Sequence, residues 1–462
     1  MTPDLFTIAA DAPLHAALAR IEGNHHGMIL GVDRAGIVVG LATDGDIRRC
    51  LLAGIGLDAP LSICLNPEFV WAGAATPRER LLKQLDHRIR VIPLLDDARH
   101  LVDIISRDRL PVQVEEPVYA RARAPVRISF GGGGSDLTHY FSDHGGAVIN
   151  TTLSLYSHAA LRLRSDPQVH VHSRDLGASL QAPDLDSALR QPGRFGLIQS
   201  LLKTVHPDFG FELYLDSDFP MGSGLGGSAV VAAAVLGCFN QFRRDQWDQH
   251  ELAELAFQAE RLHLGVAGGW QDQYATVFGG FNFMEFRMEQ NLVHPLRIPP
   301  DILIELEESL ILCDTGTTHD SGAIHDDQRD QMRREDVRDL VRANVELTYG
   351  LRDHLLRGRL LEFGKALDDA WQLKRRFSRQ ISSPALDGVY EQARVAGALG
   401  GKLVGAGGGG FFLFYVTPFR KYELIARLEA LGLSIRHFRF DHDGLRAWTI
   451  RECKNHLEPV TP

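Results

Sequence analysis

Three glycine-rich segments, far apart in the sequence, constrain this chain more than any other feature. They span Gly131–Gly134, Gly222–Gly227 and Gly405–Gly410. The middle segment follows an alternating strand that begins at Phe211, and it precedes an alanine-rich helix that begins at Ser228. Backbone amides at the start of a helix, when glycines leave them accessible, form an anion site suited to phosphate. We therefore expect folding to bring the three segments together as parts of one site.

Two other phosphate-binding folds are disfavoured by what surrounds the glycines. Gly222, Gly224 and Gly227 satisfy the GxGxxG spacing, but a dinucleotide fold needs a strand after the helix, with an acidic residue about 20 positions on. Here a charged, helix-patterned stretch, residues 245–261, follows the helix. A Walker A loop fails as well, because Lys402 is followed by leucine where a Ser or Thr is needed for magnesium.

The first 115 residues contain an internal repeat. Residues 33–43 align with residues 96–106 at a constant offset. In each copy an apolar-periodic helix, at Leu14–Ile21 or Arg78–Leu85, leads into a strand, a turn at an aspartate, a second strand and a Ser or Thr that opens a helix. A β-β-α unit this small cannot bury its own apolar face, so the two copies are expected to stack on each other.

Length and charge limit the class of protein. A chain of 462 residues should hold more than one core, since domains usually have about 100–200 residues. The formal net charge of −10 disfavours nonspecific nucleic-acid binding, which needs a basic stripe. We expect no membrane span, because apolar runs fall short of the ~18 residues required. Five dispersed cysteines without a CxxC pair fit the reducing cytosol, so the predicted location is cytoplasmic.

The domain boundaries follow from the patterning. Residues 110–124 hold two prolines and two glutamates without a clean apolar period and are predicted to be a linker. The expected domains are residues 1–115, 116–300 and 301–462.

The N-terminal repeat resembles a cystathionine-β-synthase (CBS) domain pair. The resemblance implies an adenine-nucleotide site in which a Thr and the helix start meet phosphate and an Asp three residues later meets ribose. Thr43 and Asp46 match this pattern in the first copy, whereas the second copy has Ser106 followed by Arg109 where the Asp would be. At most one ordinary nucleotide site is therefore expected, and a docking or dimerisation module is the alternative. CBS pairs commonly associate, so a homo-oligomer is predicted.

The rest of the chain resembles the galactokinase–homoserine kinase–mevalonate kinase (GHMP) superfamily. Its three motifs occur in order at residues 124–137, 220–229 and 402–411. The resemblance implies an α+β protein: a two-domain kinase whose second half is ferredoxin-like, preceded here by the CBS pair. It also implies ATP and Mg²⁺ as cofactors. The expected ATP-binding residues are Pro220, Gly222, Ser223, Gly224, Leu225, Gly226, Gly227 and Ser228.

Four side chains carry the chemistry that this resemblance implies. Ser228 and Glu260 would hold magnesium, since a hard cation that bridges phosphates needs few protein oxygens. Asp272 would face the acceptor hydroxyl and take its proton. Arg127 would keep Asp272 ionised and offset charge on the transferred phosphoryl group. The motif usually carries a run of serines, and here Ser228 stands alone after Gly227.

The form of the first motif, Gly131–Leu137, resembles the branch that contains D-glycero-D-manno-heptose 7-phosphate kinases. This implies transfer of the ATP γ-phosphate to the anomeric hydroxyl of a heptose 7-phosphate, for nucleotide-activated heptose in surface polysaccharide. The expected substrate contacts are Gly134, Ser135, Asp136, Lys374, Gly407 and Gly408. Arg375, Arg376 and Lys402 are further candidates for a second phosphate pocket.

Two alternatives stay open. His319 stands where relatives often have Arg, and a neutral His is a poorer phosphate ligand. The acceptor is then an unphosphorylated sugar of the fucose or galactose type. The other alternative is a nucleotide-binding regulatory protein without turnover, which the joint presence of Arg127, Ser228, Glu260 and Asp272 disfavours.

Overall fold

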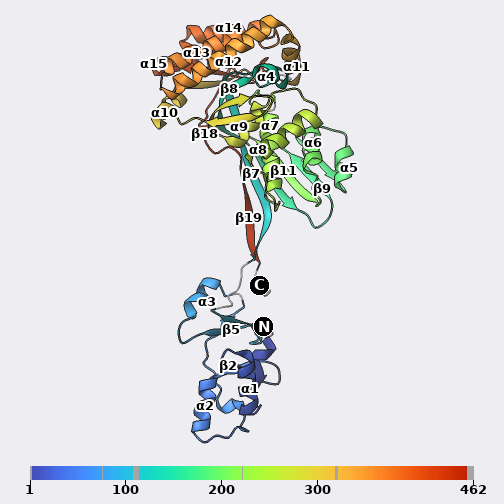
Figure 1. Ribbon diagram of the computed structural model, residues 1–462, viewed down its shortest axis with the longest axis vertical. Coiled ribbons are helices and arrows are strands. Elements are labelled where there is room, and N and C mark those ends of the chain that lie inside the picture. Colours follow the sequence, from blue (N-terminus) through green and yellow to red (C-terminus); the bar gives the residue numbers. More distant parts are fainter. Residues whose placement is uncertain (1–2, 75, 108–113, 221, 318–320, 455–462) are drawn as a thin grey trace. The chain divides into compact units, whose positions relative to one another are not determined.

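The computed structural model describes residues 3–74, 76–107, 114–220, 222–317 and 321–454. These form two compact units, one comprising residues up to 116 together with 452–454, and the other residues 117–451 (Figure 1). In these ranges no helix is long and apolar enough to cross a membrane.

The first unit contains two three-stranded sheets of the same topology. In each sheet the first strand pairs parallel with the second, and the second pairs antiparallel with the third. The first copy has η1 (Pro3–Phe6), β1 (Thr7–Ala9), α1 (Leu14–Asn24), β2 (Met28–Val32), β3 (Val38–Thr43), α2 (Asp44–Leu52) and η2 (Leu61–Ile63). The second has β4 (Ala72–Gly73), α3 (Arg78–Gln84), β5 (Val91–Leu95) and β6 (Leu101–Ser106).

The repeat is reproduced down to its turns. Asp33 caps the β2–β3 turn by accepting from the amides of Ala35 and Ile37, and Asp96 does the same in the second copy. Gly36 and Arg99 occupy the equivalent turn position, with φ of 84° and 64°. Side chains of both copies share one apolar cluster, which includes Phe6, Leu30, Leu95 and Ile104. The expected stacking is confirmed; the helix expected after Ser106 falls mostly outside the described residues.

The second unit begins with a nine-stranded sheet. Its main strand order is β10-β9-β11-β8-β12-β13, while β7 pairs with β8 and β19, and β18 pairs with β8. The strands are β7 (Val114–Gly131), β8 (Gly146–Leu163), β9 (Val169–Ser173), β10 (Ala178–Ala182), β11 (Phe211–Ser217), β12 (Phe281–Phe286), β13 (Asn291–Pro295), β18 (Phe440–Asp441) and β19 (Arg446–Lys454).

Helices pack on this sheet around α7 (Gly227–Asn240), the predicted alanine-rich helix. Small side chains let α7 lie close to β8, and nearly all of its residues are buried. Figure 1 shows α8 and α9 gathered beside it. The other helices of this half are α4 (Thr138–His144), α5 (Leu185–Arg190), α6 (Gly196–Val205), α8 (Gln249–Phe257), the π-helix η3 (Gln258–His263) and α9 (Gln271–Phe278).

The second half contains a four-stranded antiparallel sheet in the order β15-β16-β14-β17. This order and the β-α-β-β-α-β succession confirm the expected ferredoxin-like layer. Figure 1 shows its helices gathered together. The elements are α10 (Pro300–Ser309), β14 (Leu310–Asp314), α11 (Ser321–Gln331), α12 (Glu335–Leu356), α13 (Leu360–Lys374), α14 (Pro384–Val395), β15 (Ala398–Leu403), β16 (Phe411–Val416), α15 (Pro418–Ala430) and β17 (Ser434–Arg436).

The last strands, β18 and β19, belong to the nine-stranded sheet of the first half and not to the four-stranded sheet. The two halves therefore do not divide at residue 301, as the expected domains 116–300 and 301–462 would require. Phe440 and Asp441 of β18 pair with Leu153 and Thr152 of β8. The Thr152 hydroxyl donates to the carbonyl oxygen of Asp441 at 2.9 Å. The long strands β7 and β8 have backbone groups that would otherwise stay unpaired, and the chain satisfies them with its own end.

Candidate active site

The glycine-rich segments meet at one place, as expected. A Cβ on Gly405 would lie 2.2 Å from the carbonyl oxygen of Gly224, and one on Gly410 would lie 2.2 Å from that of Ser223. Only glycine permits this approach of two backbones, and both positions have φ near +80°. Lys374 connects the segment Gly131–Gly134 to this contact. Its Nζ donates to the carbonyl oxygen of Gly405 and lies 3.5 Å from where a Cβ on Gly133 would be.

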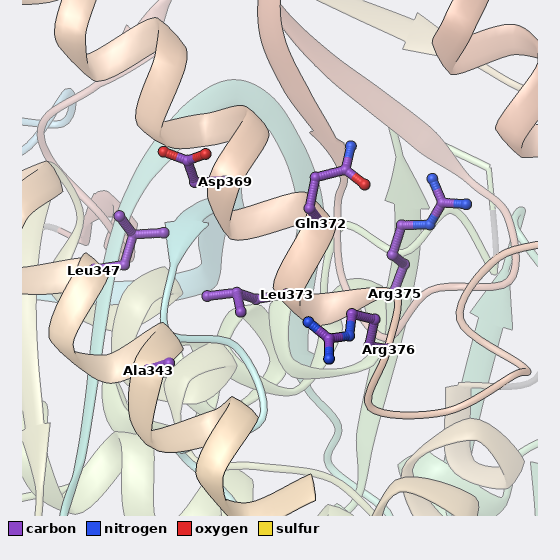
Figure 2. A pocket seen from close by; sticks show the side chains of 7 residues that line it. All are labelled: Ala343, Leu347, Asp369, Gln372, Leu373, Arg375 and Arg376. Carbon is purple, nitrogen blue, oxygen red and sulfur yellow. The ribbon is translucent and has the colours of Figure 1, made fainter. Parts of the chain in front are cut away.

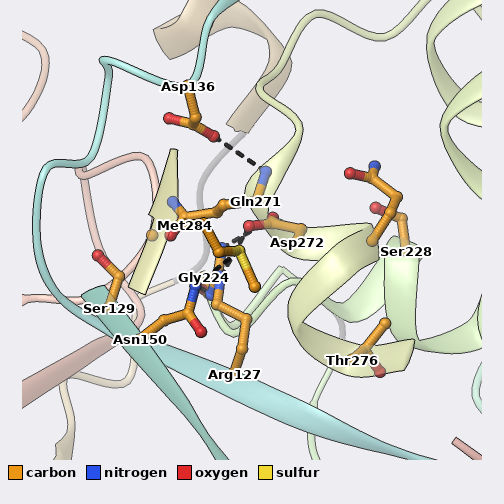
Figure 3. Close-up of polar contacts among 12 residues, drawn as sticks. Arg127, Ser129, Asp136, Asn150, Gly224, Ser228, Gln271, Asp272, Thr276 and Met284 are labelled. Carbon is orange, nitrogen blue, oxygen red and sulfur yellow. Dashed lines mark hydrogen bonds and ion pairs between the residues drawn. The ribbon is translucent and has the colours of Figure 1, made fainter. Parts of the chain in front are cut away.

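Arg127 and Asp272 form a two-point ion pair beside these loops. Arg127 Nε donates to Asp272 Oδ1 at 2.7 Å and Nη2 donates to Oδ2 at 2.8 Å, while Nη1 donates to the carbonyl oxygen of Gly224 at 2.8 Å (Figure 3). Asp272 lies in the first turn of α9, where the helix dipole also favours a negative charge. Burial alone would raise the pKa of Asp272, but the Arg127 guanidinium outweighs it and holds the pKa below its usual value.

Ser228 and Glu260 also come together. The Ser228 hydroxyl, at the start of α7, donates to Glu260 Oε1, and Gln273 Nε2 donates to Oε2 at 2.7 Å. Glu260 is 2% exposed and lies on the π-helix η3. One hydroxyl and one carboxylate facing a phosphate-binding loop fit Mg²⁺, which takes few protein ligands when phosphates supply the rest. No cluster of three or more His, Cys, Asp and Glu side chains occurs in the parts of the chain that the structure describes.

The charge of Asp272 acts on the nearby carboxylate of Asp136. This carboxylate accepts from the amide of Gly134 at 3.1 Å and from that of Gln271 at 3.3 Å, and Figure 3 shows the second bond. The expected role of Asp136 as a substrate contact stays a prediction. Burial, and then the nearby charge of Asp272, raise its pKa. Ser135 is fully buried, and its hydroxyl bonds to the backbone of Gly132 and Ala147, so it braces the loop.

Two buried lysines, Lys374 and Lys402, lie beside the glycine-rich segments. Burial, and then the charge of Arg127, lower the pKa of Lys374 to about 8. Burial and the charge of Lys374 lower the pKa of Lys402 well below its usual value, and its Nζ donates to Ser129 Oγ at 3.2 Å. The expected roles of Lys374 as a substrate contact and of Lys402 in a second phosphate pocket stay predictions.

Arg375 and Arg376 do not share this position. They line a different pocket between α12 and α13, together with Ala343, Leu347 and Gln372 (Figure 2). Arg375 is also paired with Asp387 at 3.0 Å. Successive residues at a helix end point in different directions, so of the Lys-Arg-Arg run only Lys374 reaches the glycine loops.

Gly407 and Gly408 pack against the backbone of Ile381. A Cβ on Gly407 would lie 2.8 Å from Ile381 Cα, and the Gly408 amide donates to the carbonyl oxygen of Ile381 at 2.8 Å. Their expected role as substrate contacts stays a prediction, and His319 lies outside the described residues.

A cavity of about 480 Å³ runs along the middle glycine loop. Its polar lining includes Arg127, Ser228, Glu260 and Asp272, and its apolar lining includes Leu176, Phe195, Leu197, Ile198 and Val231. Sequence reasoning missed these apolar residues, as well as Arg261 and His325, which also line the cavity. No motif marks these residues, because they come from separate elements that only the fold unites.

Thr43 and Asp46 lie in the first unit and bond to each other. Asp46 Oδ2 accepts from the Thr43 amide at 2.8 Å and hydroxyl at 2.6 Å, and the Asp46 amide donates to Thr43 Oγ1 at 3.2 Å. This is a capping box at the start of α2. Hydrogen bonding and the nearby Arg49 outweigh burial and lower the pKa of Asp46.

Comparison with known proteins finds separate families for the N-terminal unit and for the kinase unit. Residues 195–280 match the family of GHMP kinases N terminal domains, residues 351–432 match the GHMP kinases C terminal family, and residues 1–53 match the CBS domain. The D-glycero-alpha-D-manno-heptose 7-phosphate kinase of Campylobacter jejuni is 33% identical over 336 residues, which cover 71% of this chain and 99% of that protein. An L-fucokinase/L-fucose-1-P guanylyltransferase of Bacteroides fragilis is 28% identical over 337 residues, covering 66% of this chain and 35% of that protein.

A solved structure of a similar kinase has the same fold as this part of the chain. The crystal structure of a D-glycero-D-manno-heptose 1-phosphate kinase from Bacteroides thetaiotaomicron superposes with a TM-score of 0.60 at 27% identity, covering 72% of this chain and 99% of that one. Both kinase domains are matched in order, and a relative is one-third identical along nearly all of its length. This chain therefore belongs to the GHMP kinase family and carries a CBS domain at its N-terminus.

Proposed function

We propose that this sugar kinase transfers the γ-phosphate of ATP to the anomeric hydroxyl of a heptose 7-phosphate. The acceptor oxygen forms a bond to the γ-phosphorus, the bond from that phosphorus to the β–γ bridging oxygen breaks, and ADP leaves. The proton of the acceptor hydroxyl passes to Asp272. The observation that carries the proposal is the Arg127–Asp272 pair beside the middle glycine loop.

Arg127 and Asp272 orient the acceptor hydroxyl and the phosphoryl group and form no covalent bond to either. Both carboxylate oxygens of Asp272 are held by Arg127, and a lowered pKa makes the group a weak base. Phosphoryl transfer through a loose transition state needs little base strength, because the hydroxyl loses its proton late. Asp272 therefore orients the hydroxyl and receives its proton as the new bond forms, while Arg127 offsets charge on the phosphoryl group.

Ser228 and Glu260 are the residues that would hold Mg²⁺. When bound, the ion neutralises phosphate charge and polarises the bond that breaks. Ser228 lies at the start of α7, whose first backbone amides would face the same phosphates.

The proposed acceptor is supported by the cations beside Asp136. Lys374 and Lys402 are buried beside the first and third glycine loops, and both suit an anionic substrate. Asp136 would bond to ring hydroxyls. The similarity to the heptose 7-phosphate kinase of Campylobacter jejuni supports the same acceptor here, within synthesis of nucleotide-activated heptose for surface polysaccharide.

One observation favours the second candidate, an unphosphorylated sugar of the fucose or galactose type. Arg375 and Arg376, which would have widened the cationic pocket, line a separate pocket. The similarity to a fucokinase fits this alternative. A role as a regulatory protein without turnover is disfavoured, because Arg127, Ser228, Glu260 and Asp272 are all present and correctly paired.

For the N-terminal unit we propose adenine-nucleotide binding at Thr43 and Asp46 and association of two or more copies of the chain. The match of residues 1–53 to the CBS domain supports the first part. A nucleotide phosphate bound at the start of α2 would replace the hydrogen bonds that Thr43 and Asp46 make to each other.

Phosphorus NMR of the reaction products tests the proposed chemistry. The full chain with ATP, magnesium and D-glycero-D-manno-heptose 7-phosphate should yield ADP and a second sugar phosphate signal, coupled to the anomeric proton. Asp272→Asn serves as the blank. A new phosphate on any other carbon would refute the assignment of the anomeric hydroxyl.

A further inference from the structure

Three residues that line the cavity, Ser223, Arg261 and His325, each hold a buried polar atom. Ser223 Oγ, Arg261 Nε and His325 Nδ1 are buried, and none has a hydrogen-bond partner among the residues that the structure describes. Buried polar groups are nearly always paired, so three such atoms around one cavity indicate a ligand that pairs with them. Ser223 belongs to the expected nucleotide loop, but Arg261 and His325 have no assigned role.

The Arg261 side chain is held in place through Nη1, while its Nε has no hydrogen-bond partner among the described residues. Its side chain is 10% exposed and pairs with Glu260 at 3.2 Å. Nη1 donates to the carbonyl oxygens of Val266 and Ala267, both at 3.3 Å. A Cβ on Gly268 would lie 2.4 Å from Arg261 Cζ, so this glycine makes room for the side chain. The unpaired Nε is therefore a hydrogen-bond donor on a side chain whose position is fixed.

His325 reaches the same cavity from the second half of the kinase unit. Its helix, α11, is tied to the third glycine loop because Gln328 Nε2 donates to the carbonyl oxygen of Ala406 at 2.9 Å. Ser378 also donates to Asp327 of this helix, and Ile324 anchors it in the core. These contacts hold α11 in the position from which His325 lines the cavity.

The charges around His325 are mainly positive. Arg127, Arg261 and Lys374 act on it, and Asp272 is the opposing negative charge. Burial, followed by the charge of Arg261, lowers the pKa of His325 to about 3, so the ring is uncharged and has one N–H to donate. A neutral donor among three cations is suited to an anionic ligand that would satisfy all of them.

We propose that Arg261 and His325 are a phosphate-contacting pair that binds a phosphoryl group in the cavity that Ser228 also lines. The inference rests on the proposed kinase function and extends it with two positioning residues. The phosphate is either the γ-phosphate of the nucleotide or the phosphate that the acceptor already carries. Arg supplies a planar fork and His a single donor, a combination that matches the several oxygens of a phosphate group.

Binding measurements with the full chain distinguish the two sources. The variants are Arg261→Lys, which keeps the charge but loses the fork, and His325→Asn. Arg329→Gln, on the exposed face of α11, is the matched control for that helix. Calorimetry with magnesium and ATP, ADP or heptose 7-phosphate gives the affinities, and thermal unfolding without ligand checks that each variant is folded.

Contact with the γ-phosphate predicts that both variants lose about tenfold in affinity for ATP and keep their affinity for ADP. Contact with the acceptor phosphate predicts an equal affinity for ATP and about a tenfold loss for heptose 7-phosphate, with the unphosphorylated heptose unaffected. Variants that bind all three ligands like the parent protein would overturn the proposal. The nucleotide arm needs no turnover, so its outcome is separate from failure of the proposed sugar specificity.

Discussion

Arg127 and Asp272, which lie 145 residues apart in the sequence, meet in a two-point ion pair with N–O distances of 2.7 and 2.8 Å. The pair spans the end of β7 and the first turn of α9, and Arg127 also bonds to the middle glycine loop. A change on any of these elements is therefore expected to reach the reacting atoms.

Asp272→Asn tests the role of this carboxylate. The amide cannot accept the proton, so kcat should fall by about 100-fold or more, whereas the Kd for ATP should stay within a factor of about two. Rates of ADP release and calorimetric titration with ATP measure the two effects. Asp245→Asn, whose side chain is exposed, is the control. A variant with normal turnover would remove Asp272 from the reaction.

Gly405→Ala tests the contact between the glycine loops. The added Cβ would lie 2.2 Å from the carbonyl oxygen of Gly224, so the loops must separate, and a displacement of about 1 Å can cost about 100-fold in kcat/KM. Gly432→Ala is a matched control, because Gly432 has the same sign of φ, +81°, with nothing within 4 Å. It should cost about 1–2 kcal/mol of stability and leave kcat/KM unchanged. Equal activity losses in both variants would argue against the loop contact.

Ser228→Ala tests the proposed metal ligand. Loss of the single hydroxyl in this loop should raise the magnesium concentration that gives half-maximal activity by about tenfold, because one of few protein ligands is gone. Ser228→Thr keeps a hydroxyl and should behave like the parent chain. Activity measured across a magnesium titration at saturating ATP gives the result; an unchanged midpoint for the alanine variant would contradict the assignment.

The pH dependence of substrate binding tests Lys374. Its pKa of about 8 means that the free enzyme loses this positive charge as the pH rises through 8. The KM for a phosphorylated acceptor should therefore be flat from pH 6 to about 7.5 and rise above pH 8. Lys374→Arg stays charged over this range and should remove the rise. A rise of equal size in both proteins would place the titrating group elsewhere.

Thr43→Ala tests the capping box of the first unit. Loss of the box should destabilise α2 by about 1 kcal/mol and raise the hydrogen-exchange rates of its first amides. Asp44→Asn removes only the exposed pair with Arg48 and should have a smaller effect, about 0.3 kcal/mol. Equal exchange rates in Thr43→Ala and the parent chain would show that the box does not hold the helix.

Much of the site could be predicted because it depends on local chemistry. Glycine spacing indicated the loops, since only glycine allows the positive φ and close backbone contact at Gly405 and Gly410. The repeat indicated two stacked copies, since each lacks enough apolar surface alone. The pairing of Arg127 with Asp272 was predicted from the resemblance to the GHMP kinases, on the residues that match their motifs.

The remainder depends on long-range packing that no local pattern records. The π-helix that turns Glu260 inward interrupts what the sequence predicts as regular helix. The return of β18 to β8 depends on which strand edges stay open after the rest has folded. The directions of Arg375 and Arg376 depend on where α13 ends. Lys374, its last residue, reaches the glycine loops, whereas the next two residues line a different pocket.

We propose that this kinase phosphorylates a sugar that already carries a phosphate. The most direct measurement is ATP- and magnesium-dependent ADP release with D-glycero-D-manno-heptose 7-phosphate, beside the same heptose without its phosphate, with Asp272→Asn as the blank. We expect turnover with the 7-phosphate and at most a trace with the free heptose. Turnover with the free sugar, or with neither, would contradict the proposed substrate.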